Sequence, residues 1–235
     1  MLVISGVDAC KGGWISVSRD LLSGEISSQV FQSAGNLVCQ TPKPLVMAID
    51  IPIGLTDSGP RQCDLLARKM LGQPRGSSVF PAPIRPALKA RNYQEANEIT
   101  KSIDDKGVTK QAWELYTRIK EFDEILSRDP IARRIIYEVH PEVSFMAWNG
   151  GTAIVKNKKS DLGKSIRAKL VNEHFGRDAF RIVRDEHRKG LVSDHDINDA
   201  FAALWSTERI HNGTFHVIPN PPIIDSKGLQ MCMWY

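Results

Sequence analysis

Of the 235 residues in the chain, 42% are apolar and 25% are charged, and the net charge is +4. This is the composition of an ordinary soluble globular protein, long enough for one full-sized core or one core with an inserted subdomain. No apolar run approaches the roughly 20 residues that span a bilayer, and the N-terminus lacks a signal-type apolar segment. The four cysteines are widely spaced without a CxxC pair. We therefore expect a cytoplasmic protein with reduced thiols and no membrane contact.

Three strands are predicted at the start of the chain. Leu2 to Asp8 and Trp14 to Ser18 are separated by a glycine pair, and Glu25 to Phe31 follows a Ser-Gly turn. Short polar turns of this kind imply an antiparallel meander. The first strand delivers Asp8 at its end, where a carboxylate needs a partner if it is buried. Capping of the hairpin turn is the alternative explanation for this acid.

Two further apolar strands carry acids. Leu45 to Ile51 includes Asp50, and Ile135 to Val139 includes Glu138. The connection into the Asp50 strand, through a short helix or loop at Ala34 to Cys39, is long enough for a crossover. We therefore expect this strand to run parallel to the first strand. The two strand-end aspartates would then lie together at the carboxyl ends of parallel strands, where open α/β sheets place their sites.

A long insertion, residues 56 to 134, separates the second and third of these acids. Its predicted helices are Arg61 to Leu71, Tyr93 to Ile103 and Thr109 to Ser127, with the breaker-rich segment Gly72 to Pro86 between the first two. We interpret the insertion as a helical cap over the acidic edge, and a helical layer packed on the sheet is the alternative. Three arginines around the breaker-rich segment could hold phosphate groups, or could simply be solvated: Arg61, Arg75 and Arg85.

The last long predicted helix, Asp194 to Ile210, opens with acids. Asp196 and Asp199 are three residues apart and therefore share a helix face. The small and apolar run Ala200 to Ala203 follows, which lets this end of the helix lie close against a sheet. We interpret Asp194 as a residue that caps free N–H groups and complements the helix macrodipole.

Basic residues gather between positions 151 and 190, where 11 Lys or Arg stand against 5 Asp or Glu. The segment contains a predicted helix, Ser160 to Phe175, and then Phe180 to Val183, a short strand or helix end. A basic flank beside an acidic pocket suits a phosphate-rich polymer, although a solvated helix face has the same composition. Gly228 to Tyr235 is predicted as an edge strand or tail.

Five stretches carry these acids and their surroundings: VISGVDACKGGW, LVMAIDIPIGL, RQCDLLARKMLG with SSVFPAP, YEVHPEVSF and HDINDAFAALWS. Together they resemble a bacterial and archaeal domain family described as predicted RNase H-like nucleases. The resemblance implies an α/β fold in which an RNase H-like mixed sheet, an antiparallel three-strand meander plus parallel strands, is flanked by helices. The chain would form a single domain, residues 1–235, with the helical insertion at about 56–134.

A more distant resemblance, to the RNase H-like superfamily that includes Holliday-junction resolvases, implies the site. In those proteins the first-strand Asp, a fourth-strand acid and acids at the start of the last helix hold divalent metal. By motif position this corresponds to Asp8, to Asp50, and to Asp196 with Asp199. Glu138 has no clear counterpart there, so it could be a metal ligand, a partner of a ligand or a feature of this family.

Strand-end acids combined with acids one helical turn apart supply the hard oxygen ligands that Mg²⁺ and Mn²⁺ prefer. We therefore predict a metal-dependent phosphodiester hydrolase, a nuclease, in which two ions about 3.5 to 4 Å apart clamp the phosphodiester. Nucleic acid is the expected partner, with DNA and RNA both open. His140 could orient the water or leaving group, or hydrogen-bond a ligand carboxylate, and a structural role is the alternative. The predicted site residues are Asp8, Asp50, Glu138, His140, Asp196 and Asp199.

Three other functions use the same features. A non-catalytic nucleic-acid-binding or regulatory RNase H-like domain would keep the acids for folding or for a structural ion. A metal-dependent hydrolase of a small phosphate compound would use the same carboxylates. An actin-like phosphotransferase typically has Gly and a hydroxyl residue after its strand-end Asp, whereas Ala9-Cys10-Lys11 follows here. The apolar residues Met231 to Met233 and Trp234-Tyr235 could pack on a second copy and form a homo-oligomer.

Overall fold

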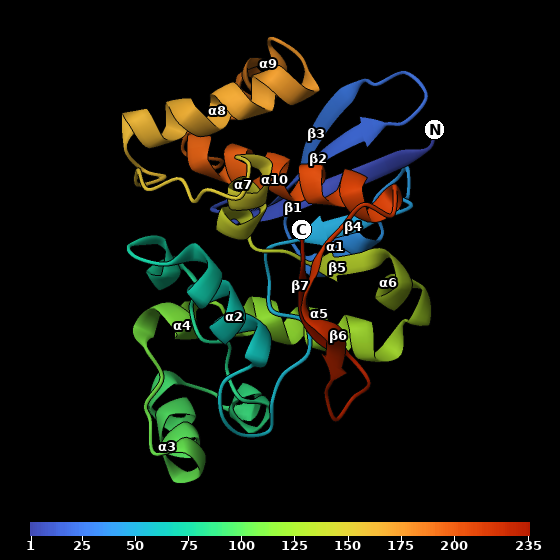
Figure 1. Cartoon of the computed structure of the whole chain (residues 1–235). Helices are drawn as coiled ribbons and strands as arrows, with labels where there is room; N and C mark the ends of the chain where they lie inside the picture. Colours follow the sequence, from blue (N-terminus) through green and yellow to red (C-terminus); the bar gives the residue numbers. More distant parts are fainter.

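A five-stranded mixed sheet forms the centre of the computed structural model, which describes residues 1–235 (Figure 1). The strands β1 (Val3–Cys10), β2 (Gly13–Asp20) and β3 (Ile26–Phe31) form an antiparallel meander. β4 (Met47–Ile49) pairs parallel with β1, and β5 (Ile136–Glu138) pairs parallel with β4. The order β3-β2-β1-β4-β5 confirms the predicted meander and the predicted parallel pairing of the first and fourth strands.

Helices cover the sheet and fill the insertion between β4 and β5 (Figure 1). They are α1 (Ala34–Val38), α2 (Gln62–Leu71), the 3₁₀ helices η1 (Arg75–Ser78) and η2 (Arg85–Lys89), α3 (Tyr93–Asp104), α4 (Lys110–Glu114), α5 (Tyr116–Arg128), α6 (Pro130–Ile135), α7 (Pro141–Trp148), α8 (Asp161–Phe175), α9 (Ala179–Glu186) and α10 (Asp194–His211). None of these helices has both the length and the apolar character that crossing a membrane requires.

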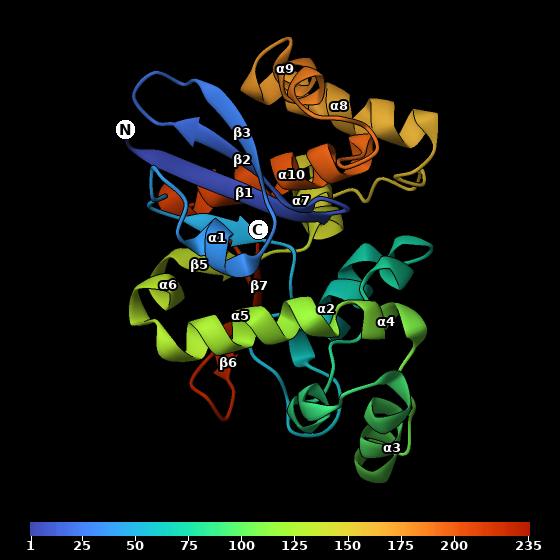
Figure 2. The same cartoon turned by 180° about the vertical axis from the view of Figure 1, so that it is seen from behind.

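Alternation of side chains along the central strands gives each face of the sheet its own core. Val7 points to the face on which α1 and α5 pack, and there it shares a buried cluster with Leu37 and Phe122 (Figure 2). Ile4 points to the opposite face, where α10 contributes Phe201 and α8 contributes Val171 (Figure 1). The residues at even positions of β1 therefore face α10.

β1 and α10 approach each other closely because position 6 is glycine. A Cβ atom at Gly6 would lie 2.0 Å from the backbone nitrogen of Leu204 and 2.3 Å from the carbonyl oxygen of Ala200. One helical turn further, Thr207 Oγ1 donates a hydrogen bond of 3.0 Å to the carbonyl oxygen of Ser5. The close approach at Gly6 places the first turns of α10 beside the carboxyl end of β1, as the small residues after Asp199 predict.

The insertion contributes both a helical layer and a wall beside the acidic edge. The buried face of α5 packs into the core below the sheet through residues such as Ile119 and Phe122. α2 and η1 instead contribute side chains to a cavity that also contains Asp8 and Asp50. The helix predicted at Thr109 to Ser127 is interrupted at Leu115, which separates α4 from α5.

The C-terminal part forms a separate two-stranded sheet from β6 (Val217–Ile224) and β7 (Gln230–Trp234). β7 confirms the predicted edge strand, but the proline-rich segment before it is also a strand. Proline is tolerated there because β6 pairs only with β7, and the register shifts between Ile218 and Ile223. The segment Phe180 to Val183 is helical and belongs to α9.

Candidate active site

Two strand-end aspartates lie side by side because their strands are parallel neighbours. Val7 of β1 pairs with Ile49 of β4, so Asp8 and Asp50 follow one residue later at the same edge. The backbone N–H of Asp50 donates to the carbonyl oxygen of Val7 at 3.2 Å, which continues the pairing past the end of β4. Asp8 lies on the same face as Gly6, and Asp50 lies on the same face as Ala48, which packs against Ala203. Both carboxylates therefore face α10.

α10 brings two further acids to this place. Asp199 is fully buried in its second turn, and its Oδ1 atom has no hydrogen-bond partner. Asp196 forms a capping box with Ser193, because its Oδ2 atom accepts a 2.8 Å hydrogen bond from the Ser193 N–H. Asp194, interpreted as the cap, instead pairs with Arg184 at 3.2 Å. The structure thus brings Asp196 and Asp199 to the edge that carries Asp8 and Asp50.

Lys158 is the cation of this cluster. It comes from the loop before α8, and its Nζ atom lies 2.5 Å from Asp199 Oδ2. The carboxylates of Asp199, Asp8 and Asp50 raise the pKa of Lys158 against the opposing effect of burial. The ammonium group is therefore charged at neutral pH.

Asp8 and Asp50 hold protons more tightly than isolated aspartate side chains. Burial raises the pKa of Asp8 well above its ordinary value, and the charges of Asp199 and Asp50 raise it further. Burial also raises the pKa of Asp50 to about 7, although Lys158 opposes the shift. Like charges in a region of low dielectric constant repel, so protons or a cation must neutralise part of this charge. Such a cluster is suited to binding a divalent ion.

Glu138 is directed elsewhere by the register of β5. It pairs with Ile49, and paired residues of neighbouring strands point to the same face, which here is the one opposite α10. Its carboxylate accepts two hydrogen bonds from the guanidinium of Arg61, at 2.6 and 2.7 Å, and one from the Ile53 N–H at 2.6 Å. Asp64 binds the same guanidinium at 2.6 Å. Glu138 therefore borders the same cavity as Asp8 and Asp50, but its carboxylate is bound in an ion network with Arg61.

The same network occupies the one compact group of metal-type ligands in the protein. Cys63, Asp64 and Glu138 offer ligand atoms that lie within 4.8 Å of one another. Arg61, with only 1% of its side chain exposed, already binds both carboxylates. Burial alone would lower the pKa of Arg61, but Asp64 and Glu138 raise it well above its ordinary value. The guanidinium supplies the positive charge that a metal ion would otherwise bring.

His140 precedes α7 and borders the same cavity as Asp8 and Asp50. Its Nε2 atom lies 3.4 Å from the carbonyl oxygen of Ser78, which can only accept a hydrogen bond. We therefore assign the proton to Nε2, which leaves Nδ1 as an unprotonated acceptor without a partner in the protein. Burial, together with the charge of Lys158, lowers the pKa of His140 and keeps the ring neutral.

These groups surround one cavity of about 510 Å³. Asp8, Asp50 and Asp196 line it, while Asp199 lies beneath its surface behind Lys158. The remaining walls come from the segment after β4, from α2 and η1, from β5 and the start of α7, from the loop before α8 and from β7. Elements far apart in the sequence thus converge on one acidic cavity.

A family model described as "Protein of unknown function (DUF429)" matches residues 6–223. The chain belongs to this family. The match extends from β1 into β6 and includes all six of the predicted site residues. No curated protein and no solved structure showed significant similarity to the chain.

Two charged residues of this DUF429 chain were not anticipated from the sequence. Lys158 is one of 11 basic residues between positions 151 and 190, and only that local excess of positive charge pointed to it. Glu142 follows the predicted His140 and lines the cavity, but its carboxylate accepts two 2.8 Å hydrogen bonds from Arg167. Both long-range pairings depend on the path of the chain between α7 and α8, which has no local sequence signature.

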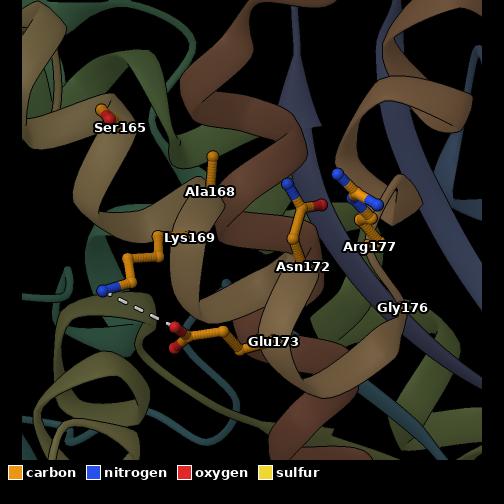
Figure 3. Close-up of a pocket in the computed structure, with 7 residues that line it drawn as sticks. All are labelled: Ser165, Ala168, Lys169, Asn172, Glu173, Gly176 and Arg177. Atoms are coloured by element: carbon orange, nitrogen blue, oxygen red, sulfur yellow. Dashed lines mark ion pairs between the residues drawn. The ribbon is translucent and has the colours of Figure 1, made fainter.

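The DUF429 chain has another hollow, on the outer side of α8 (Figure 3). Lys169 and Glu173, one turn apart on α8, form an ion pair of 3.6 Å at its edge, and their side chains are 75% and 60% exposed. None of the predicted acids lines this hollow. An exposed ion pair of this kind is typical of a solvated helix surface, so the hollow offers no group suited to catalysis.

Proposed function

We propose that this protein is a metal-dependent phosphodiester hydrolase of the RNase H-like type, acting on nucleic acid. The observation that carries the proposal is the convergence of Asp8, Asp50 and Asp199 from three separate elements. Buried carboxylates are rarely placed together unless a cation or a proton neutralises them. The mixed sheet, with its meander and its parallel strands, supports the RNase H-like assignment because the acids stand at the positions that this resemblance implies.

The acids supply the oxygen ligands that a hard divalent ion prefers, although no three of their carboxylates lie within 4.8 Å of one another in the protein. Asp199 keeps one buried oxygen without any hydrogen-bond partner, and only burial and neighbouring charges, not hydrogen bonds, shift the pKa values of Asp8 and Asp50. Four carboxylates and no thiolate within the cluster favour Mg²⁺ or Mn²⁺ over softer metals. The residues that would hold the ion are Asp8, Asp50, Asp196 and Asp199. A bound ion would supply an activated water and would stabilise the charge on the leaving oxygen.

Two further side chains support the reaction from the protein side. His140 Nδ1 is an unpartnered acceptor at the border of the cavity, suited to receiving a proton from an attacking water. Lys158 places a positive charge beside Asp199, where it limits the repulsion among the acids. Glu138 has a structural role in this proposal, because it orients Arg61 and the segment that follows β4.

Cleavage of labelled single-stranded, double-stranded and branched DNA and RNA with Mn²⁺ or Mg²⁺ tests the proposal. We expect metal-dependent cleavage by the wild type that is lost in both Asp8→Asn and Asp199→Asn. The exposed acid Asp185 supplies a matched control, since Asp185→Asn removes a carboxylate away from the cavity and leaves cleavage unchanged. Nucleic-acid binding without cleavage would favour a binding role. Hydrolysis of a small phosphodiester alone would favour a small phosphate substrate.

A further inference from the structure

One arginine on the insertion side of the acidic cavity has no anionic partner. Arg75 lies in η1 and lines the cavity together with Asp8 and Asp50. No acid lies within ion-pairing distance of it, and its buried Nε atom has no hydrogen-bond partner. A buried donor that is left unpaired is unfavourable, because it loses water without gaining a partner. An anion that enters the cavity would satisfy it.

The other basic side chains predicted to hold phosphate are committed elsewhere. Arg61 is buried between Asp64 and Glu138. Arg85 pairs with Asp123 at 2.7 Å and also with Asp225, and it does not line the cavity. The structure therefore distinguishes Arg75 from Arg61 and Arg85, the other two arginines that the sequence alone treated alike.

The turn that carries Arg75 is anchored to α2. The carbonyl oxygen of Val79 accepts a 2.8 Å hydrogen bond from Arg68 Nε. A Cβ atom at Gly76 would lie 2.8 Å from the carbonyl oxygen of Arg68, so only glycine allows this close approach. At the other end of η1, the carbonyl oxygen of Ser78 contacts His140. Arg75 is thus presented from a fixed turn.

A second unpaired cation lines the same cavity. Lys159 neighbours Lys158 in the loop before α8; it is exposed to solvent, and its ammonium group has no acidic partner in the protein. By contrast, Lys158 is paired with Asp199, and His195 lies 3.4 Å from Asp196. Arg75 and Lys159 are therefore the two cavity cations whose charge remains available to a ligand.

We propose that Arg75 and Lys159 form a phosphate-binding subsite that holds a phosphate next to the one positioned at the carboxylates. This inference rests on the proposed function and narrows its substrate class to molecules with at least two neighbouring phosphates, such as a nucleic-acid strand. A guanidinium can bind a phosphate through two parallel hydrogen bonds, whereas an ammonium acts as a point charge. The acids select the phosphate that reacts, and the subsite fixes the register of the strand.

Binding of labelled 12-nucleotide DNA and RNA strands, measured by fluorescence anisotropy with Ca²⁺ at several salt concentrations, tests the subsite. We expect Arg75→Ala to weaken binding by about tenfold and to reduce the slope of log K against log salt by about 0.7, which corresponds to one lost contact on a single strand. Arg75→Lys recovers part of the affinity because it keeps the charge. Manganese binding by calorimetry should be unchanged in Arg75→Ala, which shows that the variant is folded and its acids are intact.

Arg91→Ala is the matched control, because the Arg91 side chain is 87% exposed and lies outside the cavity. Equal affinity and equal salt slope for the wild type, Arg75→Ala and the control would overturn the subsite while leaving the nuclease proposal intact. Loss of affinity without a change in salt slope would also overturn it. Failure of the wild type to bind any strand, with or without metal, would overturn both proposals.

Discussion

Lys158 Nζ lies 2.5 Å from Asp199 Oδ2, so a lysine from a loop compensates the charge of a fully buried helix acid. The pair joins the basic segment before α8 to the first turns of α10. The charges of Asp8 and Asp50 also raise the pKa of Lys158, so the lysine interacts with the same carboxylates that would hold a cation. A divalent ion and this ammonium group would therefore compete for, or share, the same carboxylates.

Replacement of Lys158 by methionine should destabilise the metal-free protein. The change leaves the buried Asp199 without its cation, so we expect the free energy of unfolding to fall by roughly 1 to 3 kcal/mol. The loss is smaller than for a fully buried pair because the Lys158 side chain is 33% exposed. Saturating Mn²⁺ should raise the melting temperature of Lys158→Met more than that of the wild type. The exposed Lys189 provides the control variant, Lys189→Met. An equal rise in melting temperature with Mn²⁺ in all three proteins would contradict an interaction between Lys158 and the metal-binding carboxylates.

The metal-free protein should respond to pH through Asp50. Its pKa in the folded protein is about 7 against an ordinary value of 3.8, so the folded state binds more protons than the unfolded state between these values. The contribution of Asp50 to the free energy of unfolding therefore falls as pH rises from about 4 to about 7. Asp50→Asn should be more stable than the wild type above pH 7, by at most about 4 kcal/mol, and this advantage should shrink toward pH 4.

Chemical unfolding in the presence of EDTA at several pH values measures this difference. The two proteins must be compared because other groups also make the free energy of unfolding depend on pH. Burial raises the pKa of Glu138 to about 7, so Glu138 lowers the stability with rising pH as Asp50 does. His140, whose pKa burial lowers, contributes with the opposite sign. A stability difference between the wild type and Asp50→Asn that stays constant with pH would contradict the assignment of the raised pKa to Asp50.

Much of the fold could be predicted because its signals are local. The alternating strand that ends at Asp8 and the small residues after Asp199 both indicate how a strand and a helix pack, and both predictions are confirmed. The break at Leu115 was missed because the apolar stripe of α5 continues through it. The strand β6 was missed because its prolines are tolerated only on an unpaired edge, and pairing is a property of the folded chain.

The candidate site was only partly predictable. Parallel pairing of two strands explains why the sequence brings Asp8 and Asp50 together. The direction of Glu138 depends on the register of β5 against β4, and a shift of one residue would turn it to the other face. The approach of Lys158 and the binding of Arg61 by Glu138 join residues 41 and 77 positions apart. No spacing rule reveals contacts of that kind.

Glu138→Gln separates a structural role from metal binding. The variant removes one of the two carboxylates that neutralise the buried Arg61 guanidinium. We expect a loss of about 3 to 5 kcal/mol, because this cost outweighs the relief of burying the Glu138 charge, whose pKa is raised to about 7. Manganese affinity of the folded fraction should stay within about twofold of the wild type, because Glu138 faces away from α10. Thermal unfolding and calorimetry at a temperature where the variant is folded check both points. A large loss of metal affinity without destabilisation would indicate that Glu138 is a metal ligand.

Gly6→Ala tests the close packing that positions the acids. The added methyl group would overlap the backbone of Leu204 and Ala200, which cannot move without shifting α10. We expect a loss of about 3 kcal/mol or more and a weaker response to Mn²⁺, because Asp199 would move away from Asp8. Gly59→Ala is a control for glycine replacement, since a Cβ at Gly59 meets no atom within 4 Å, although its φ of +69° adds local strain. Wild-type stability and metal response in Gly6→Ala would contradict this account of the packing.

Calorimetric titration with Mn²⁺ at neutral pH tests the central claim most directly. We expect the wild type and the control Asp185→Asn to bind Mn²⁺ with similar affinity, and Asp8→Asn and Asp199→Asn to bind it at least about tenfold more weakly. Folding of each variant is checked by its thermal unfolding. Absence of binding by the wild type, or equal binding by all four proteins, would contradict a metal site formed by the converging carboxylates.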